Sequence, residues 1–405
     1  MNLMPAKLTP GRRAFYLLLG TAACFFTPFA ATLVKYCWKV PEGMIRFPAT
    51  EPNTKAGFNL IVAVAISLSF VAVSFLFLLP SLFGFKPPLV PDPQTKPTRK
   101  GLPVWFWLGL LLWAGALALL GLKAREPAWL VNWALLPLFW GFTLVLDGWV
   151  YVRKGGRSMV SRSFRELIAI GMVSISGWLV FEWLNFFVHI NWYYPKASIL
   201  PHDEFLLYAV TGSSGLMPMA FEWYELLSSF HGLRERYRRG PIVRATKTLQ
   251  MILLLGCFTG LFATVFRPDL FFFVLWVAPL IILSILLEWM GIWTPFTPLE
   301  QGDWAPLLLF SLTYLVQGFL LESWNYASGF HQSGGELLTH NPAYWAYTVP
   351  YVDFFHVFEM PILGYLGYLP FGAYCWVWWI TTSYILDIRS GYTYDPEFRH
   401  KKFQE

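Results

Sequence analysis

Charged residues are scarce in this sequence, and their scarcity decides its class. Asp, Glu, Lys and Arg make up 13% of the 405 residues, whereas 56% are hydrophobic and 19% are aromatic. Because soluble domains carry about a quarter charged residues, an ordinary water-soluble fold is excluded. The apolar runs are too long for the strands of an outer-membrane barrel, and helices satisfy their own backbone hydrogen bonds in lipid. We therefore predict an all-α, polytopic membrane helical bundle.

Disulfide and metal-binding patterns are missing as well. The four cysteines form no CxxC motif and no cluster with histidine, so neither a disulfide framework nor a structural zinc site is predicted. Asp353 and His356 have the i, i+3 spacing of a carboxylate–histidine ligand pair. That pair occurs in only one half of the chain, and a hydrogen-bonded histidine explains it better. We predict no metal and no cofactor.

The net charge of +6 does not indicate nucleic acid in this chain. Basic residues are concentrated in short loops between apolar runs, chiefly in 153–163 and 231–245. By the positive-inside rule these loops and both termini face the cytoplasm, which predicts a multi-pass protein of the cell (inner) membrane. Glu222 and Glu225 approach the second loop, so we expect interfacial ion pairs there rather than chemistry.

Apolar runs that can span a bilayer recur along the chain and predict about ten transmembrane helices. They occupy residues 14–35, 57–84, 104–122, 127–152, 164–190, 203–230, 246–265, 268–292, 304–327 and 350–386. The last run exceeds one bilayer thickness, so we expect a kink near Pro370 or an interfacial continuation. Gly212, Gly215 and Pro218 favour a broken helix in the sixth run.

The chain also contains an internal duplication. Glu182-Trp183-Leu184-Asn185 matches Glu322-Ser323-Trp324-Asn325, and an aromatic pair and a proline follow each copy. The simplest architecture is two N-terminal helices plus two parallel four-helix repeats, related by an axis along the membrane normal. The predicted divisions are two N-terminal helices (1–85), a proline-rich cytoplasmic linker (86–103), a first repeat (104–230), a basic cytoplasmic loop (231–245), a second repeat (246–386) and a cytoplasmic tail (387–405).

Acids within the apolar runs are the candidate functional residues. A charge in hydrocarbon costs about 2.5 to 3.5 kcal/mol on insertion scales, so Glu182 and Glu322 should face the bundle interior. Asn185 and Asn325 follow them by three residues on the same helix face and should orient them. Interhelical hydrogen bonding without chemistry remains an alternative for all four. Further acids occur at Asp203, Glu204, Asp353 and Glu359, of which the first two could simply be helix-start residues.

Aromatic side chains accompany these acids in both repeats. A carboxylic acid in apolar surroundings keeps its proton near neutral pH and can protonate an alkene, and ring faces stabilise the resulting carbocation. We predict that the catalytic acids and bases are Glu182, Asp203, Glu204, Glu322 and Asp353. The predicted substrate-binding residues are Asn185, Trp192, Tyr193, Asn325, Trp345, Tyr347, His356 and Glu359.

The stretch from Glu182 to Tyr208 resembles one repeat of the membrane lycopene cyclases, the heterodimeric bacterial and fused fungal type. In this resemblance Glu182 takes the place of the family's membrane acid, and Trp192 and Tyr193 that of its W-x-Y aromatics. Residues 201–204 (Pro-His-Asp-Glu) are similar to its P-x-E-E motif. The second unit is similar through Glu322, Asn325, Trp345, Tyr347 and Asp353. The resemblance implies cofactor-independent, acid-catalysed ring closure of a long polyene.

The leading hypothesis is therefore a membrane-embedded enzyme that cyclises, isomerises or hydrates an apolar isoprenoid or carotenoid. Membrane lipid and this substrate are the predicted partners, and nucleic acid is not. A proton- or cation-coupled transporter remains an alternative, since duplicated units with matched intramembrane acids also describe a carrier. A non-catalytic membrane subunit that binds pigment or quinone is a third. The sequence leaves open whether the two units share one site.

Overall fold

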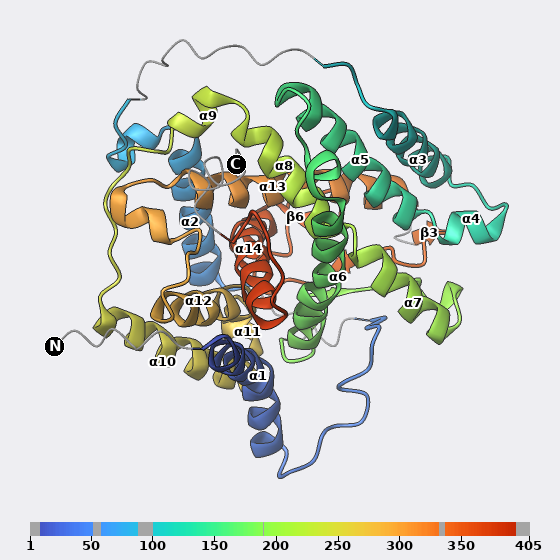
Figure 1. Ribbon diagram of the computed structural model, residues 1–405. Coiled ribbons are helices and arrows are strands. Elements are labelled where there is room, and N and C mark those ends of the chain that lie inside the picture. The colour runs from blue at the N-terminus through green and yellow to red at the C-terminus, as the bar shows by residue number, and fades with distance from the viewer. Residues whose placement is uncertain (1–8, 52–57, 88–99, 189, 332–336, 394–405) are drawn as a thin grey trace.

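Helices dominate the chain in the computed structural model (Figure 1). The structure describes residues 9–51, 58–87, 100–188, 190–331 and 337–393. Most of the predicted linker 86–103 and of the predicted tail 387–405 therefore lies outside the described residues.

The elements follow one another in an order that keeps helices long and strands very short. The α-helices are α1 (Pro10–Lys35), α2 (Leu60–Leu78), α3 (Val104–Gly121), α4 (Ala128–Asn132), α5 (Leu135–Arg153), α6 (Met159–Asn185), α7 (His202–Ser213), α8 (Leu216–Ser228), α9 (His231–Glu235), α10 (Lys247–Thr264), α11 (Pro268–Phe271), α12 (Val274–Trp289), α13 (Ala305–Ala327) and α14 (Tyr368–Ile385). The 3-10 helices are η1 (Pro80–Phe83), η2 (Ala197–Ile199), η3 (Thr297–Gln301) and η4 (Ile362–Gly367). The strands are β1 (Trp192–Tyr193), β2 (Gly329–His331), β3 (Leu337–Thr339), β4 (Ala346–Tyr347), β5 (His356–Val357) and β6 (Met360–Pro361). The predicted all-α class is confirmed.

Seven of the described helices are long and apolar enough to cross a membrane: α1, α2, α3, α5, α6, α10 and α13. Helix α12 is also apolar but shorter. Their number and composition agree with a membrane protein, whereas the count of ten spans stays a prediction.

The sixth apolar run is a broken helix, as its glycines and proline predicted. Helix α7 ends at Ser213 and α8 begins at Leu216. The hydroxyl of Ser174 on α6 donates to the carbonyl of Ser213 at 2.6 Å and accepts from the backbone N–H of Met217 at 3.1 Å. A helix break is tolerated at membrane depth only where neighbours satisfy the freed backbone groups, and α6 does so here.

The tenth apolar run is helical only in its second half, so the expected helix from residue 350 is wrong. Residues 356–361 form the β5–β6 hairpin, η4 follows, and α14 begins at Tyr368. Tyr351, Phe355 and Phe358 have positive φ angles of 63°, 53° and 61°, a left-handed conformation that no right-handed helix can contain. Pro370 lies in the first turn of α14, where its missing N–H has no helical partner to lose.

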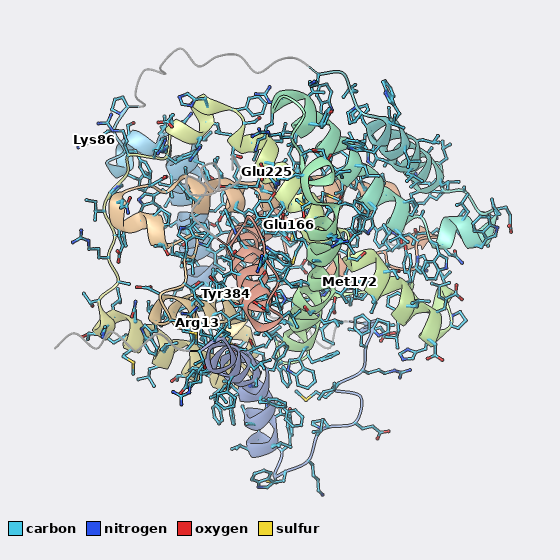
Figure 2. The ribbon with its side chains drawn as sticks, viewed as in Figure 1. Arg13, Lys86, Glu166, Met172, Glu225 and Tyr384 are labelled. Carbon is cyan, nitrogen blue, oxygen red and sulfur yellow. The ribbon has the colours of Figure 1, made fainter. Side chains whose placement is uncertain are left out.

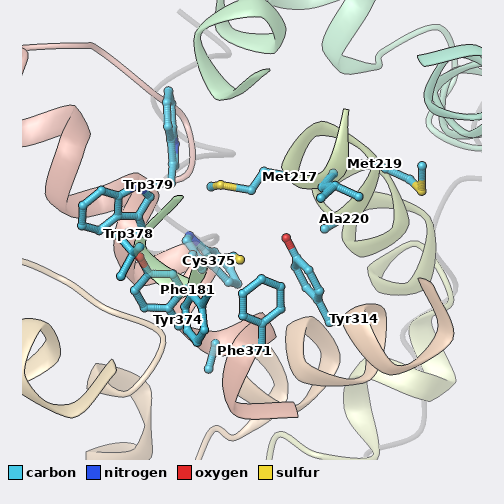
Figure 3. Packing of buried hydrophobic residues seen from close by; sticks show 14 of the residues in the cluster. Phe181, Met217, Met219, Ala220, Tyr314, Phe371, Tyr374, Cys375, Trp378 and Trp379 are labelled. Carbon is cyan, nitrogen blue, oxygen red and sulfur yellow. The ribbon is translucent and has the colours of Figure 1, made fainter. Parts of the chain in front are cut away.

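Helix α14 lies at the centre of the bundle, with α1, α6, α12 and α13 packed around it (Figure 1). Its sequence is apolar or aromatic on every side, which is typical of a fully surrounded helix. Trp376 and Trp379 are 1% and 0% exposed. Near its N-terminal end Phe371 and Tyr374 pack on Phe181 of α6, with ring centroids 4.8 Å apart in both pairs (Figure 3).

The two matched halves have the same order of elements and meet at two short strands. Helices α3 to α6 run long, short, long, long, and α10 to α13 follow the same order. Strand β1 pairs antiparallel with β4, so that Trp192 lies opposite Tyr347 and Tyr193 opposite Ala346. A local two-fold axis between Tyr193 and Ala346 would produce this register. The strands therefore bring the aromatic loops of both halves together.

Helices α3 and α5 cross at two glycines with no side chain between them. A Cβ atom added at Gly109 would lie 2.6 Å from the backbone oxygen of Gly141 and 2.6 Å from Cβ of Leu144. A Cβ atom at Gly141 would lie 2.6 Å from the backbone nitrogen of Trp113. Small residues at such a crossing let membrane helices approach closely and gain van der Waals contact.

Replacing Gly109 with alanine should therefore lower the melting temperature of the detergent-solubilised protein. Overpacking costs about 1–3 kcal/mol, more than the roughly 0.5–1 kcal/mol that alanine gains over glycine inside a helix. Gly115→Ala on the same helix is the matched control, because its new methyl group would meet nothing within 4 Å. Equal melting temperatures for the two variants would contradict the close crossing.

Candidate functional site

Glu182 lies in the last turn of α6 and is 4% exposed. One of its oxygens, Oε1, accepts three hydrogen bonds, from Trp178 Nε1 at 3.0 Å, Trp192 Nε1 at 3.0 Å and the Tyr194 hydroxyl at 2.5 Å. Charge-assisted bonds of this kind stabilise a carboxylate that has lost its water. The second oxygen, Oε2, is left for a proton.

Glu322 on α13 is surrounded in the same way and is 0% exposed. Its Oε1 accepts from Trp345 Nε1 at 3.1 Å, from the Tyr347 hydroxyl at 2.6 Å and from the Tyr368 hydroxyl at 2.7 Å. Its Oε2 has no hydrogen-bond partner among the described residues. The two glutamates therefore have similar surroundings, with three neutral donors on Oε1 of each.

Two of the three donors come from equivalent positions, and the third does not. Trp178 precedes Glu182 by one helical turn, and the matching position on α13 is Gly318. A Cβ atom at Gly318 would lie 2.6 Å from the ring of Tyr368. The missing side chain thus makes room for a tyrosine from α14, which replaces the tryptophan as third donor.

The asparagines act on the aromatic loops. Asn185 Nδ2 donates to the carbonyl of Trp192 at 2.9 Å, and Asn325 Nδ2 donates to the carbonyl of Trp345 at 2.8 Å. Their Oδ1 atoms accept backbone N–H groups of the same loops, from Asn191 at 2.7 Å and Trp345 at 3.2 Å. The expectation that they orient the glutamates directly is therefore replaced by an indirect role, because they position the tryptophans that bond the glutamates.

The loop tyrosines are held as hydrogen-bond donors. Burial raises the pKa of Tyr194 well above its ordinary value, and the neighbouring Glu182 carboxyl raises it further. Burial and the Glu322 carboxyl raise the pKa of Tyr347 in the same manner. Both phenols consequently keep their protons at any physiological pH.

The donors to both glutamates line one cavity of about 130 Å³, whereas Glu182 and Glu322 themselves lie behind these donors and are not among its lining residues. All six donors to Glu182 and Glu322 are in its wall: Trp178, Trp192, Tyr194, Trp345, Tyr347 and Tyr368. Further rings complete it, and two of them, Phe181 and Trp276, stack with centroids 5.1 Å apart. The two repeats therefore contribute to one aromatic enclosure.

The other acids predicted for catalysis or substrate binding lie elsewhere. Asp203 is exposed at the start of α7, and Glu204 accepts from Trp133 Nε1 at 3.1 Å. Asp353 is 3.1 Å from the exposed His356, and Glu359 accepts from the hydroxyl of Tyr344. Within the described residues, the cavity wall contains none of these acids. The described residues also include no group of three or more His, Cys, Asp or Glu side chains that could hold a metal ion.

A second set of buried acids lies on α6 and α8, away from the donors described above. Glu225 pairs with Lys154 and accepts from the Tyr392 hydroxyl at 2.7 Å. Glu166 accepts from the Ser390 hydroxyl at 2.6 Å; Figure 2 labels both glutamates. These bonds tie the segment after α14 to the bundle. Within the described part of the chain, Glu225 therefore forms an ion pair, as expected, but with Lys154 of the first basic loop and not with the second. The carboxyl oxygens of Glu222 have no hydrogen-bond partner among the described residues.

Local spacing could have identified one donor that the sequence analysis missed. Tyr194, rather than Tyr193, stands two residues after its tryptophan, as Tyr347 does after Trp345. Tyr193 lies opposite Ala346 in the strand pair. Tyr368 gives no such signal, because it is 46 residues from Glu322.

Comparisons of this chain with known family models, curated proteins and solved structures give no match.

Replacing Asn185 with leucine should release the first aromatic loop. The change leaves the Asn191 N–H and the Trp192 carbonyl without their partner, and each buried unpaired group costs about 1–3 kcal/mol. Hydrogen–deuterium exchange should accelerate in a peptide covering residues 190–195. Asn325→Leu is the matched comparison and should affect the 343–348 peptide first. Unchanged exchange in both variants would contradict the clamping role.

Proposed function

We propose that this protein is a membrane-embedded, cofactor-independent enzyme that moves protons on an apolar polyene of the isoprenoid or carotenoid class. The observation that carries this proposal is that all six donors to Glu182 and Glu322 line one aromatic cavity. The proposal includes the ten spans, the two parallel four-helix repeats and an inner-membrane location with both termini cytoplasmic. The resemblance to membrane lycopene cyclases supports the same chemistry.

The surroundings of each glutamate suit an acid that gives up its proton during reaction. In an apolar interior a neutral carboxylic acid has a lower free energy than a carboxylate, because burying a charge removes its hydration. Once Oε2 has lost its proton, the three donors already aimed at Oε1 stabilise the carboxylate without rearrangement. The same donors would serve a carboxylate that accepts a proton, so each glutamate is equipped for either role.

As a cyclisation or an isomerisation, the reaction that we propose gains and loses no atoms. The proton of one glutamic acid adds to a carbon of a C=C bond, so that a C–H bond forms, the π bond breaks and the adjacent carbon becomes cationic. In cyclisation a second C=C bond attacks this cation and transfers the charge. The other glutamate, as carboxylate, then removes a proton from a neighbouring carbon, and that electron pair becomes a new C=C bond. Ring faces in the wall, such as those of Phe181 and Trp276, favour the cation.

A proton-coupled carrier is the second candidate, because one side of the cavity is a broken helix. Gly212, Ser213 and Leu216 around the α7–α8 break line the cavity, and transporters commonly place substrate at such breaks. Uptake of a substrate into proteoliposomes, driven by a pH gradient and with no chemical change, would favour the carrier over the enzyme.

Glu182→Gln and Glu322→Gln should each abolish product formation while the protein still inserts and folds. Glutamine keeps an oxygen for the three donors but carries no transferable proton, and general acid–base groups contribute about 10²–10⁴-fold to rate. The measurement compares organic-extractable isoprenoids from a deletion strain complemented with each variant.

Glu126→Gln supplies the control for these variants. Glu126 is exposed and precedes α4, so its variant should give the wild-type extract. Full conversion by both glutamine variants at Glu182 and Glu322 would end the enzymatic proposal.

Gly318→Ala should weaken activity by acting only on the third donor to Glu322. The added methyl group would overlap the Tyr368 ring, which must then move away from the carboxyl that it bonds at 2.7 Å. We expect a loss of about tenfold or more, in line with the loss of one preorganised donor. Gly256→Ala, in the middle of α10 with nothing within 4 Å of the new atom, is the matched control. Equal rates for the two alanine variants would show that Tyr368 is dispensable.

A further inference from the structure

Gln317 is a buried amide in the cavity wall that the proposed proton transfers do not use. It lies on α13, is 0% exposed, and precedes Glu322 by five residues. At 1.5 Å of rise per residue, this places it about 7.5 Å along the helix axis from the glutamate. A buried amide needs partners for its nitrogen and its oxygen.

Within the part of the chain that the structure describes, only the nitrogen of the amide has a partner. Gln317 Nε2 donates to the backbone carbonyl of Leu216 at 3.0 Å, at the first residue of α8. Its Oε1 has no partner among the described residues. The amide cannot be turned over, because a carbonyl only accepts and would then face Oε1. Leaving a buried acceptor unpaired costs about 1–3 kcal/mol, which a bound donor would recover.

The position that matches Gln317 in the other half of the chain carries no amide, although the wall also holds the buried hydroxyls of Tyr208 and Tyr314, which have no partner among the described residues. The residue five before Glu182 is Gly177. An added Cβ atom there would lie 2.9 Å from the indole of Trp378, which covers this position with a ring. The two glutamate environments are alike, whereas the acceptor is present on α13 alone.

We propose that the cavity takes a ligand with a hydroxyl group, whose O–H donates to Gln317 Oε1 and orients the ligand toward α13. This inference rests on the proposed function and specifies its substrate chemistry. A donor is required because the free amide atom is an oxygen, and an uncharged donor is required because no described acid lines this wall beside it. The hydroxyl belongs either to the polyene itself or to water.

Water at this position would make the reaction a hydration. Protonation of the C=C bond by one glutamic acid gives the carbocation, and the water oxygen then forms a C–O bond with it. The other glutamate, as carboxylate, takes the proton that the water loses. One alkene and one water give one alcohol, with no redox change. Gln317 holds the water by its hydrogen bond and is a positioning residue.

The test begins with binding to the wild-type protein in detergent. All-trans-retinol and axerophtene differ only by the hydroxyl group, and both conjugated chains quench tryptophan emission, which the indoles of the cavity wall supply. If the polyene carries the hydroxyl, retinol should bind about tenfold more tightly than axerophtene, the effect of one hydrogen bond. In Gln317→Leu and Gln317→Met the ratio of the axerophtene and retinol dissociation constants should fall to about one. Axerophtene should still bind to both variants, which would show that the cavity is folded.

The second arm of the test follows conversion of the polyene substrate by membranes that contain the protein, in water labelled with oxygen-18. If water occupies the position, wild-type membranes should give a product that carries the label, and Gln317→Leu should give unlabelled, isomerised product instead. Equal binding of the two polyenes together with no label in the product overturns the inference while leaving the proposed enzyme intact. A retinol preference without any glutamate-dependent conversion supports the hydroxyl site and removes the proposed enzyme.

Discussion

A carboxyl group enclosed by apolar helices must either keep its proton or be surrounded by donors, and this constraint organises the centre of the molecule. Glu182 and Glu322 satisfy it identically, each with three neutral donors on Oε1. The donors are the indoles of tryptophan and the phenols of tyrosine. The same side chains therefore stabilise the glutamates by hydrogen bonds and form the aromatic wall of the cavity. The cavity is therefore a consequence of how the two acids are buried. Loops that carry a tryptophan and a tyrosine fold back toward the acids, and Asn185 and Asn325 clamp them there.

The matched halves of the chain explain why the surroundings of the two acids meet at one cavity. The repeats meet at the β1–β4 pair, whose register matches a local two-fold relation, so equivalent groups approach the cavity from opposite sides. Divergence then acts on single positions. Gly318 admits Tyr368 where the other repeat uses Trp178, and Gln317 places an acceptor where the other repeat has glycine. The two halves of the cavity wall are therefore similar in their tryptophan and tyrosine donors and differ at these two positions.

The helix breaks serve the same centre. Between α7 and α8 the backbone loses its own hydrogen bonds, and Ser174 and Gln317 from neighbouring helices bond to it. The late start of α14 leaves room for η4 beside the cavity, where Gly364 and Gly367 are in the wall. In both places the irregular backbone lines the cavity.

The sequence by itself determined the membrane class, the all-α fold, the break in the sixth run and the matched glutamates, because hydropathy and short spacing encode these features within a single helix or loop. It also placed tryptophans beside each acid. Only the tertiary structure decided that the donors to both acids line one cavity and that Tyr368 completes the second environment from 46 residues away. It also decided that Asp203 and Asp353 have no hydrogen-bond contact with these donors in the cavity wall. Such contacts depend on how α6, α13 and α14 pack against one another, and no periodicity along the chain records that packing.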